Sequence, residues 1–255
     1  MTAERGSTLA GSIGSLGFAR IWGQAVQFAG FILAARLLGP EAFGIYALVY
    51  LACAFLTLAA ALGWAEYAIA HEEDREAALL VAQTIGAVAG VMLAVGGAVA
   101  DRIFDAGGEI ALLSLLLAIF IPLRATGALI GSQLIAQNRV VRVAQAQMFS
   151  ETVGFAIVAA CLMSGQGILS LGYAKIGQEL SAIAFCLVFT GWFRGRLPTR
   201  VQLRRMAPFA WRMQIGGVAH FAQENIVTLL IGSFFGAAGA GIYRAGARMT
   251  SAATE

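Results

Sequence analysis

The chain has 255 residues, of which 59% are hydrophobic and only 12% are charged, and its mean hydropathy is +0.79. Soluble globular domains carry roughly 25% charged residues. This composition excludes an ordinary soluble domain and indicates an integral membrane protein, while the net charge of +3 is small.

The apolar residues come in blocks of about 20 that are separated by short charged clusters, which is the spacing that a bilayer imposes on helices. These blocks predict spans over residues 12–35, 43–64, 77–100, 110–136, 143–164, 168–192 and 213–235, with an eighth beginning near 240. No strand-like alternation competes with this pattern. The predicted fold is therefore all-α, a polytopic transmembrane helix bundle with about seven to eight spans.

The distribution of cations predicts the orientation of the bundle. If the N-terminus is cytoplasmic, the cytoplasmic segments contain ten arginines, whereas the outer loops contain only Arg36 and Arg102. Cytoplasmic loops are enriched in Lys and Arg. We therefore expect a multi-pass protein of the bacterial inner membrane with its N-terminus in the cytoplasm.

The segment 193–212, FRGRLPTRVQLRRMAPFAWR, is the longest stretch outside the predicted spans and is strongly basic. Two interpretations stay open, an amphipathic helix lying on anionic lipid headgroups and a plain loop that fixes topology. In both, it divides the chain into a first six-span bundle (1–192), a basic cytoplasmic linker (193–212) and the start of a second bundle (213–255).

A repeat supports this division. LLGPEAFGIY at 37–46 and FFGAAGAGIY at 234–243 align Gly39 with Gly236 and Tyr46 with Tyr243, each where one span ends and the next begins. Many transporters are built from two repeated helix bundles with a substrate site between them. A unit that begins again at the seventh span fits a six-helix repeat, since six crossings return the chain to its starting side.

Several ionisable and polar side chains fall inside predicted spans, where they are costly and usually face a bundle interior or a watery cavity. Arg124 lies midway along its span, and Arg20 shares one face of the first span with Gln24 and Gln27. The other members of this set are Lys175, Glu151, Glu179 and Glu224. Such polar stripes are typical of a cavity wall.

The stretch ARLLGPEAFGIYAL at 35–48, after a first helix that carries Gln24 and Gln27, resembles the start of a known family. AQNRVVRVAQAQ at 136–147 and SGQGILSLGYA at 164–174 fit its basic inner turn and its Gly-x-Gly outer turn. This is the oligosaccharide flippase family (polysaccharide biosynthesis, O-antigen translocase) of the multidrug/oligosaccharidyl-lipid/polysaccharide exporter superfamily. The resemblance implies two six-helix bundles in a V shape that move a polyprenyl-pyrophosphate-linked oligosaccharide across the inner membrane by alternating access. Because members are usually longer, it also implies that this chain corresponds to the first bundle and the opening of the second.

Two interpretations of the intramembrane charges remain open. In the first, Arg20, Arg124 and Lys175 offer positive charge to the pyrophosphate, since the planar fork of arginine donates two hydrogen bonds together. In the second, the three cations pair with Glu151, Glu179 and Glu224 as structural contacts between helices. Glu179, one turn after Lys175, is the obvious partner of that lysine. These carboxylates are also candidates for coupling to a proton or a cation.

We expect no enzyme, because no nucleophile, base and orienting partner can be assembled, and we expect no cofactor, no metal site and no nucleic-acid partner. Alternatives to the flippase are a cation-coupled drug exporter of the same superfamily, which would need a net acidic cavity, and a non-transporting truncated membrane partner. A membrane-embedded glycosyltransferase is disfavoured, because the loops lack acidic sugar-nucleotide motifs. Expected partners are the lipid-linked oligosaccharide, anionic lipids at 193–212, and a second half-bundle or a second copy of the chain.

Overall fold

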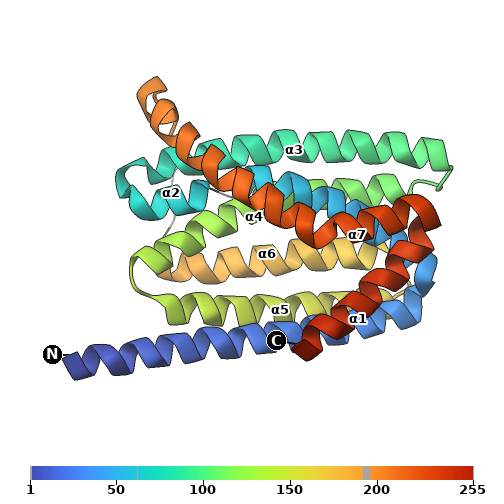
Figure 1. Cartoon of the computed structure of the whole chain (residues 1–255), viewed down its shortest axis with the longest axis horizontal. Coiled ribbons are helices and arrows are strands. Elements are labelled where there is room, and N and C mark those ends of the chain that lie inside the picture. The colour runs from blue at the N-terminus through green and yellow to red at the C-terminus, as the bar shows by residue number, and fades with distance from the viewer. Residues whose placement is uncertain (1, 62, 192–195, 255) are drawn as a thin grey trace.

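The computed structural model describes residues 2–61, 63–191 and 196–254, and this part of the chain contains helices and no strand. The helices are α1 (Thr2–Ala61), α2 (Trp64–Ala70), α3 (Arg75–Phe104), α4 (Glu109–Ala136), α5 (Val140–Met163), α6 (Leu169–Thr190) and α7 (Arg200–Thr254), with a short 3₁₀ helix at Glu72–Asp74. The long helices run side by side along one axis, and α7 crosses the bundle obliquely (Figure 1). The predicted all-α class is confirmed.

The two longest helices, α1 and α7, are each bent sharply at one glycine. The backbone of Gly39 has φ 75° and ψ 167°, and that of Gly236 has φ 72° and ψ −174°. This region of backbone space is essentially restricted to glycine. Pro40 follows the first bend, where its fixed φ and missing N–H suit the start of a helix. The turns expected around residues 39 and 236 are therefore single-residue bends between two helical segments.

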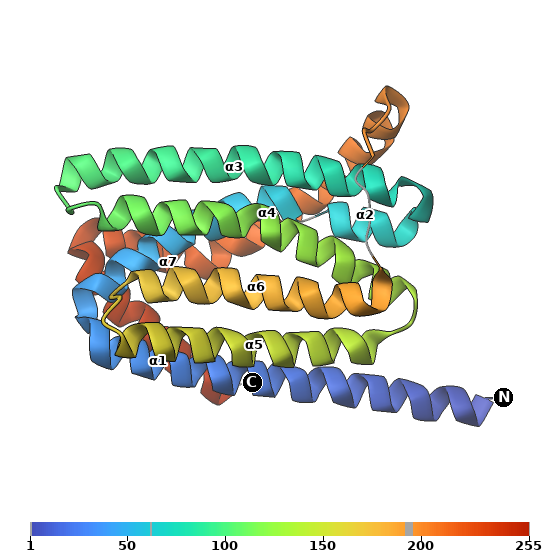
Figure 2. The ribbon, with the colours of Figure 1, turned by 180° about the vertical axis from the view of Figure 1, so that it is seen from behind.

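Helices α3 to α6 agree within a few residues with the spans predicted over 77–100, 110–136, 143–164 and 168–192. The bend of α1 and the α3–α4 and α5–α6 connections lie at one end of the bundle, and the α4–α5 connection lies at the other (Figure 2). The Asp101 carboxylate fixes the start of α4, because it accepts hydrogen bonds from the backbone N–H groups of Gly108 (2.9 Å) and Ile110 (3.1 Å).

The helix that covers the predicted span 43–64 ends at Ala61, within a few residues of the expected end, and the short helix α2 follows it. Gly63, with φ 86°, makes this break, and its N–H donates a 2.7 Å hydrogen bond to Glu66. A Cβ atom at Gly63 would lie only 2.7 Å from the Cα atom of Ala210 in α7. The short helix α2 was not predicted, because residues 64–70 continue the apolar pattern.

Four helical stretches of the described chain are long and apolar enough to cross a membrane: Gly17–Ala70, Glu72–Phe104, Glu109–Ala136 and Val140–Met163. The first has 54 residues and contains the bend at Gly39. Since one crossing needs about 20 residues, it is long enough for the two crossings expected there. The crossings expected over 168–192 and 213–235 stay predictions, and α6 carries Lys175 and Glu179 in its middle.

The basic segment joins the bundle through one face of α7. This helix begins at Arg200, earlier than the start expected at 213, and continues through the basic residues without a break before Gly236. Met206 and Ala210 are buried in the main apolar core, whereas Arg204 and Arg205 are exposed. Residues 200–212 are thus the first turns of α7 and pack on the preceding helices.

Candidate functional site

Two adjoining cavities lie inside the bundle. The larger one is partly open and has a volume of about 500 Å³ between α1, α2, α4, α5 and α6. Its charged lining residues are Glu66, Arg124, Glu151, Lys175 and Glu179. The smaller one, of about 110 Å³, has mainly apolar walls from α1, α5 and α6. Both are lined by Gln27, Tyr50, Glu151, Lys175 and Gln178, so a polar cluster separates an open chamber from an apolar crevice.

Arg124 on α4 and Glu179 on α6 form an ion pair across the larger cavity, with Nη1 of Arg124 donating to Oε1 of Glu179 at 3.0 Å. The arginine side chain is 52% exposed, whereas the glutamate side chain is only 6% exposed. Gly127 makes room for this carboxylate, since a Cβ atom there would lie 3.0 Å from Oε2 of Glu179. The arginine is therefore both paired and open to the cavity.

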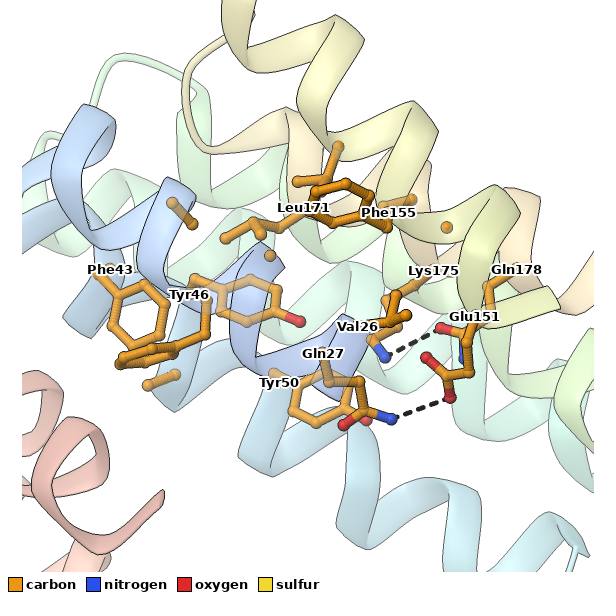
Figure 3. A pocket seen from close by; sticks show the side chains of 17 residues that line it. Val26, Gln27, Phe43, Tyr46, Tyr50, Glu151, Phe155, Leu171, Lys175 and Gln178 are labelled. Atoms are coloured by element: carbon orange, nitrogen blue, oxygen red, sulfur yellow. Dashed lines mark hydrogen bonds between the residues drawn. The ribbon is translucent and has the colours of Figure 1, made fainter. Parts of the chain in front are cut away.

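Glu151 on α5 has a different partner. Its Oε1 accepts a 2.9 Å hydrogen bond from Nε2 of Gln27 on α1 (Figure 3). The residue is buried, and Gly23 on α1 packs against its side chain. An amide donor satisfies part of the hydrogen-bonding capacity of this carboxylate without a cation, and the partly buried contact links α1 to α5.

Lys175 on α6 does not pair with Glu179, although the two lie one turn apart. Its Nζ donates a 3.1 Å hydrogen bond to Oε1 of Gln178 and lies 5.6 Å from the centre of the Tyr50 ring. Figure 3 shows the lysine turned toward the smaller cavity, beside Gln27 and Tyr50. The expected partner of Lys175 is held by Arg124 instead, because α4 packs closely on α6.

The apolar crevice begins beside this polar cluster. Phe31, Phe43, Tyr46, Phe155 and Leu171 contribute to its walls. The rings of Phe31 and Phe43 meet edge to face, with their centres 5.0 Å apart. The wall thus offers aromatic and aliphatic surface directly next to the groups that carry charge.

Among the residues predicted from sequence, the structure brings five together at the cavities. These are Gln27, Arg124, Glu151, Lys175 and Glu179. Arg20 and Gln24 are exposed on α1 and are not among the residues that line the two cavities. The side chain of Glu224 lies outside the described part of the chain.

Sequence reasoning missed Tyr50, Gln178 and Gly127 at this site. Gln178 directly precedes Glu179 and lies one turn after Lys175, so its place in a polar patch on α6 was visible in the sequence. Tyr50 and Gly127 gave no such signal, since each lies in an apolar helix and matters only through contacts with a neighbouring helix.

Family and fold comparisons agree with this architecture. Residues 32–255 match the model of a family described as Polysaccharide biosynthesis protein. The chain belongs to this family. The match confirms the resemblance inferred from residues 35–48, 136–147 and 164–174. No curated protein matches the chain in sequence.

Three solved transporter structures share the fold of this polysaccharide biosynthesis family member. An inward-facing multidrug resistance MATE family transporter of the MOP superfamily superposes with a TM-score of 0.66 at 14% identity, over 89% of this chain and 58% of that chain. An outward-facing MATE family transporter gives 0.60 at 19% identity, over 94% and 60%. A MOP superfamily transporter from Pyrococcus furiosus, whose reversed pocket polarity suggests a different function, gives 0.56 at 15% identity, over 94% and 60%.

Such low identities establish the fold alone. The chain spans about 60% of the length of the solved structures that it matches. Its helices correspond to a multi-pass membrane bundle with the architecture of MOP superfamily transporters.

Proposed function

We propose that this protein contributes one wall of a flippase that moves a polyprenyl-pyrophosphate-linked oligosaccharide across the bacterial inner membrane for surface polysaccharide synthesis. The observation that carries the proposal is Arg124, whose guanidinium is half exposed to a cavity of about 500 Å³ inside a membrane bundle. A cation at that depth is costly unless a ligand or a counter-ion uses it. In this proposal the N-terminus is cytoplasmic, and a second half-bundle or a second copy of the chain supplies the opposite wall.

The most exposed charge in the larger cavity is a cation. Arg124 is half exposed and Lys175 is partly exposed, whereas Glu151 and Glu179 are buried. The third carboxylate, Glu66, is partly exposed and accepts a hydrogen bond from the backbone at the start of α2. Two accessible cations against one accessible carboxylate favour an anion such as a pyrophosphate.

The apolar crevice supports a ligand with an apolar part. Its aromatic and aliphatic walls lie next to Lys175 and Gln178. One amphipathic molecule could therefore place its charged group at the cations and its apolar part against these walls. Membership in a polysaccharide biosynthesis family favours a sugar attached to such an anchor.

The second candidate is a cation-coupled drug exporter. It is favoured by the number of carboxylates, since Glu66, Glu151 and Glu179 outnumber the two cations around the same cavity. Binding to the purified protein separates the two functions. The flippase predicts competition between geranyl pyrophosphate and inorganic pyrophosphate, and the exporter predicts binding of a lipophilic cation such as tetraphenylphosphonium that Glu151→Gln weakens.

The decisive experiment measures surface polysaccharide in cells that depend on this protein. Arg124→Gln and Arg124→Glu should reduce export by at least tenfold at unchanged membrane abundance, because the cation that meets the pyrophosphate is lost. Arg102→Gln is the matched control, since Arg102 is exposed in the last turn of α3 and lines neither cavity. Normal export by Arg124→Glu would refute the assigned role.

A further inference from the structure

An open groove lies where α7 crosses the junction between α1 and α2. It has a volume of about 460 Å³ and is lined by Trp64, Ala207, Pro208, Ala210, Trp211 and Gln214. Trp64 is buried, whereas Trp211 is 64% exposed. The groove is separate from the two cavities of the candidate site, since none of its residues lines either of them.

Polar groups at the floor of the groove are already bonded within the protein. The indole N–H of Trp64 donates a 3.3 Å hydrogen bond to the carbonyl oxygen of Ala59, and Nε2 of Gln214 donates to the same oxygen at 3.0 Å. This carbonyl lies in the last turn of α1, where a helix leaves carbonyl groups without backbone donors. The groove therefore offers mainly carbon surface, including two indole rings and the ring of Pro208, to the molecule that fills it.

Two arginines continue the groove side of α7 toward the start of the helix. Arg200 precedes Ala207 by seven residues, and residues seven apart lie on one face of a helix. Arg204 precedes Trp211 by the same interval. Both arginines are exposed, and neither has an ion-pair partner among the described residues. Because α7 begins at the end of the bundle where α2 lies (Figure 1), the cations are at the outer end of the groove and its apolar walls lie deeper.

We propose that this groove binds one anionic phospholipid of the surrounding membrane, with its phosphate at Arg200 and Arg204 and the upper part of an acyl chain between the two indole rings. The inference uses the membrane architecture of the fold and not the substrate of the proposed function. It differs from diffuse attraction of a basic segment to anionic headgroups, because a single lipid molecule is held both by its charge and by its chain.

The order of these groups along α7 matches the order of groups in a phospholipid. Guanidinium groups bind phosphate through paired hydrogen bonds, and tryptophan rings favour the boundary between headgroups and chains. Arg204 and Trp211 are about 10 Å apart along the helix axis, at 1.5 Å per residue, so one lipid reaches both. An anionic lipid is favoured over phosphatidylcholine, since choline would bring a further cation to the two arginines.

The test measures tryptophan fluorescence of the purified full chain in detergent. The chain has four tryptophans, and Trp22→Phe with Trp192→Phe leaves only the two in the groove. Phosphatidylglycerol with brominated acyl chains quenches the indoles that its chains contact. We expect saturable quenching at a lipid mole fraction roughly tenfold lower than for brominated phosphatidylcholine, the effect of two cations on one phosphate.

Two pairs of arginines separate a specific site from diffuse attraction. Arg200→Gln with Arg204→Gln should remove the preference for phosphatidylglycerol. Arg205→Gln with Arg212→Gln is the matched control and should keep it, because these exposed arginines share a face of α7 with Phe209, which does not line the groove. Each pair removes two charges, so diffuse attraction would weaken equally in both variants.

Two further measurements address the acyl chain. Ala207 is exposed, so Ala207→Phe should leave the fold intact while it fills the groove, and quenching by both lipids should fall. Glycerol phosphate has the charge of the lipid but no chain. It should compete on the order of a hundredfold more weakly than phosphatidylglycerol, because it buries no apolar surface.

Three results would overturn the inference. Equal loss of the preference in the two arginine pairs would indicate diffuse attraction, and full competition by glycerol phosphate would indicate a site for free phosphate. Groove indoles that neither lipid quenches would leave the groove to another occupant, a second copy of the chain if the purified protein is dimeric. None of these results bears on export by Arg124→Glu, so the lipid site and the proposed function can fail independently.

Discussion

Gln27 and Glu151 are 124 residues apart in sequence, yet the amide of one donates a 2.9 Å hydrogen bond to the carboxylate of the other across the α1–α5 interface. Glu151 is only 7% exposed, so this bond replaces part of the water that the carboxylate loses on folding.

This bond predicts a pattern of stabilities. Gln27→Leu leaves a buried carboxylate without its donor and should destabilise the protein by about 1–3 kcal/mol. Replacing both partners, as in Gln27→Leu with Glu151→Leu, should cost less than the sum of the two single changes. Thermal unfolding in detergent measures all four proteins. Strict additivity would show that the two side chains do not interact.

The close packing of α3 on α4 predicts a contrast between two glycines. A Cβ atom at Gly90 would lie 2.6 Å from the carbonyl oxygen of Ala118, whereas one at Gly96 would meet nothing within 4 Å. Gly90→Ala should therefore destabilise the protein by about 1–3 kcal/mol. Gly96→Ala should be neutral or stabilising, since alanine favours helix. Equal melting temperatures for the two variants would contradict the packing.

The hydrogen bonds of Asp74 should hold the start of α7 against the rest of the bundle. Its buried carboxylate accepts hydrogen bonds from the Tyr67 hydroxyl (2.9 Å) and from Nε2 of Gln202 on α7 (2.7 Å). Asp74→Ala removes the acceptor for both donors, so we expect trypsin to cleave after Arg204 and Arg205 roughly tenfold faster. The neighbouring exposed residue provides the control, Glu73→Ala, which should leave the rate unchanged. Unchanged cleavage in Asp74→Ala would mean that other contacts hold α7.

The orientation is testable with single cysteines in a chain whose Cys53, Cys161 and Cys186 are replaced by Ala. With a cytoplasmic N-terminus, Ala106→Cys lies outside and Gln137→Cys inside, because these loops are at opposite ends of the bundle. A membrane-impermeant maleimide should label Ala106→Cys in intact spheroplasts and Gln137→Cys only after permeabilisation. The reverse labelling would invert the assigned topology.

Local patterns in the sequence predicted most of the helices. Apolar blocks of bilayer length gave α3 to α6, and the Gly-Pro pair located the bend at Gly39, because each signal resides in adjacent residues. The short helix α2 after Gly63 was not predicted, since residues 64–70 continue the apolar pattern. The close contact of Gly63 with Ala210 of α7, more than 140 residues later, could not be read from local sequence.

The candidate site was predictable as a set of side chains but not as a set of contacts. A charge inside an apolar block is visible in the sequence, which is why Arg124 and Glu179 were found. Their pairing depends on how α4 packs against α6, and a helix-local argument assigned Glu179 to Lys175 instead. Gln27 lines both cavities whereas Arg20 and Gln24 line neither, although all three are exposed on α1.

The nearly identical dihedral angles of Gly39 and Gly236 carry a consequence for mutational tolerance. This positive-φ, extended backbone conformation costs residues other than glycine on the order of 1–3 kcal/mol. Both bends should therefore tolerate glycine alone. In a saturation mutagenesis library scored for folded protein, substitutions at Gly39 and at Gly236, 197 positions apart, should be strongly depleted. Substitutions at the neighbouring positions should be tolerated. That spacing equals the offset between the two similar stretches at 37–46 and 234–243.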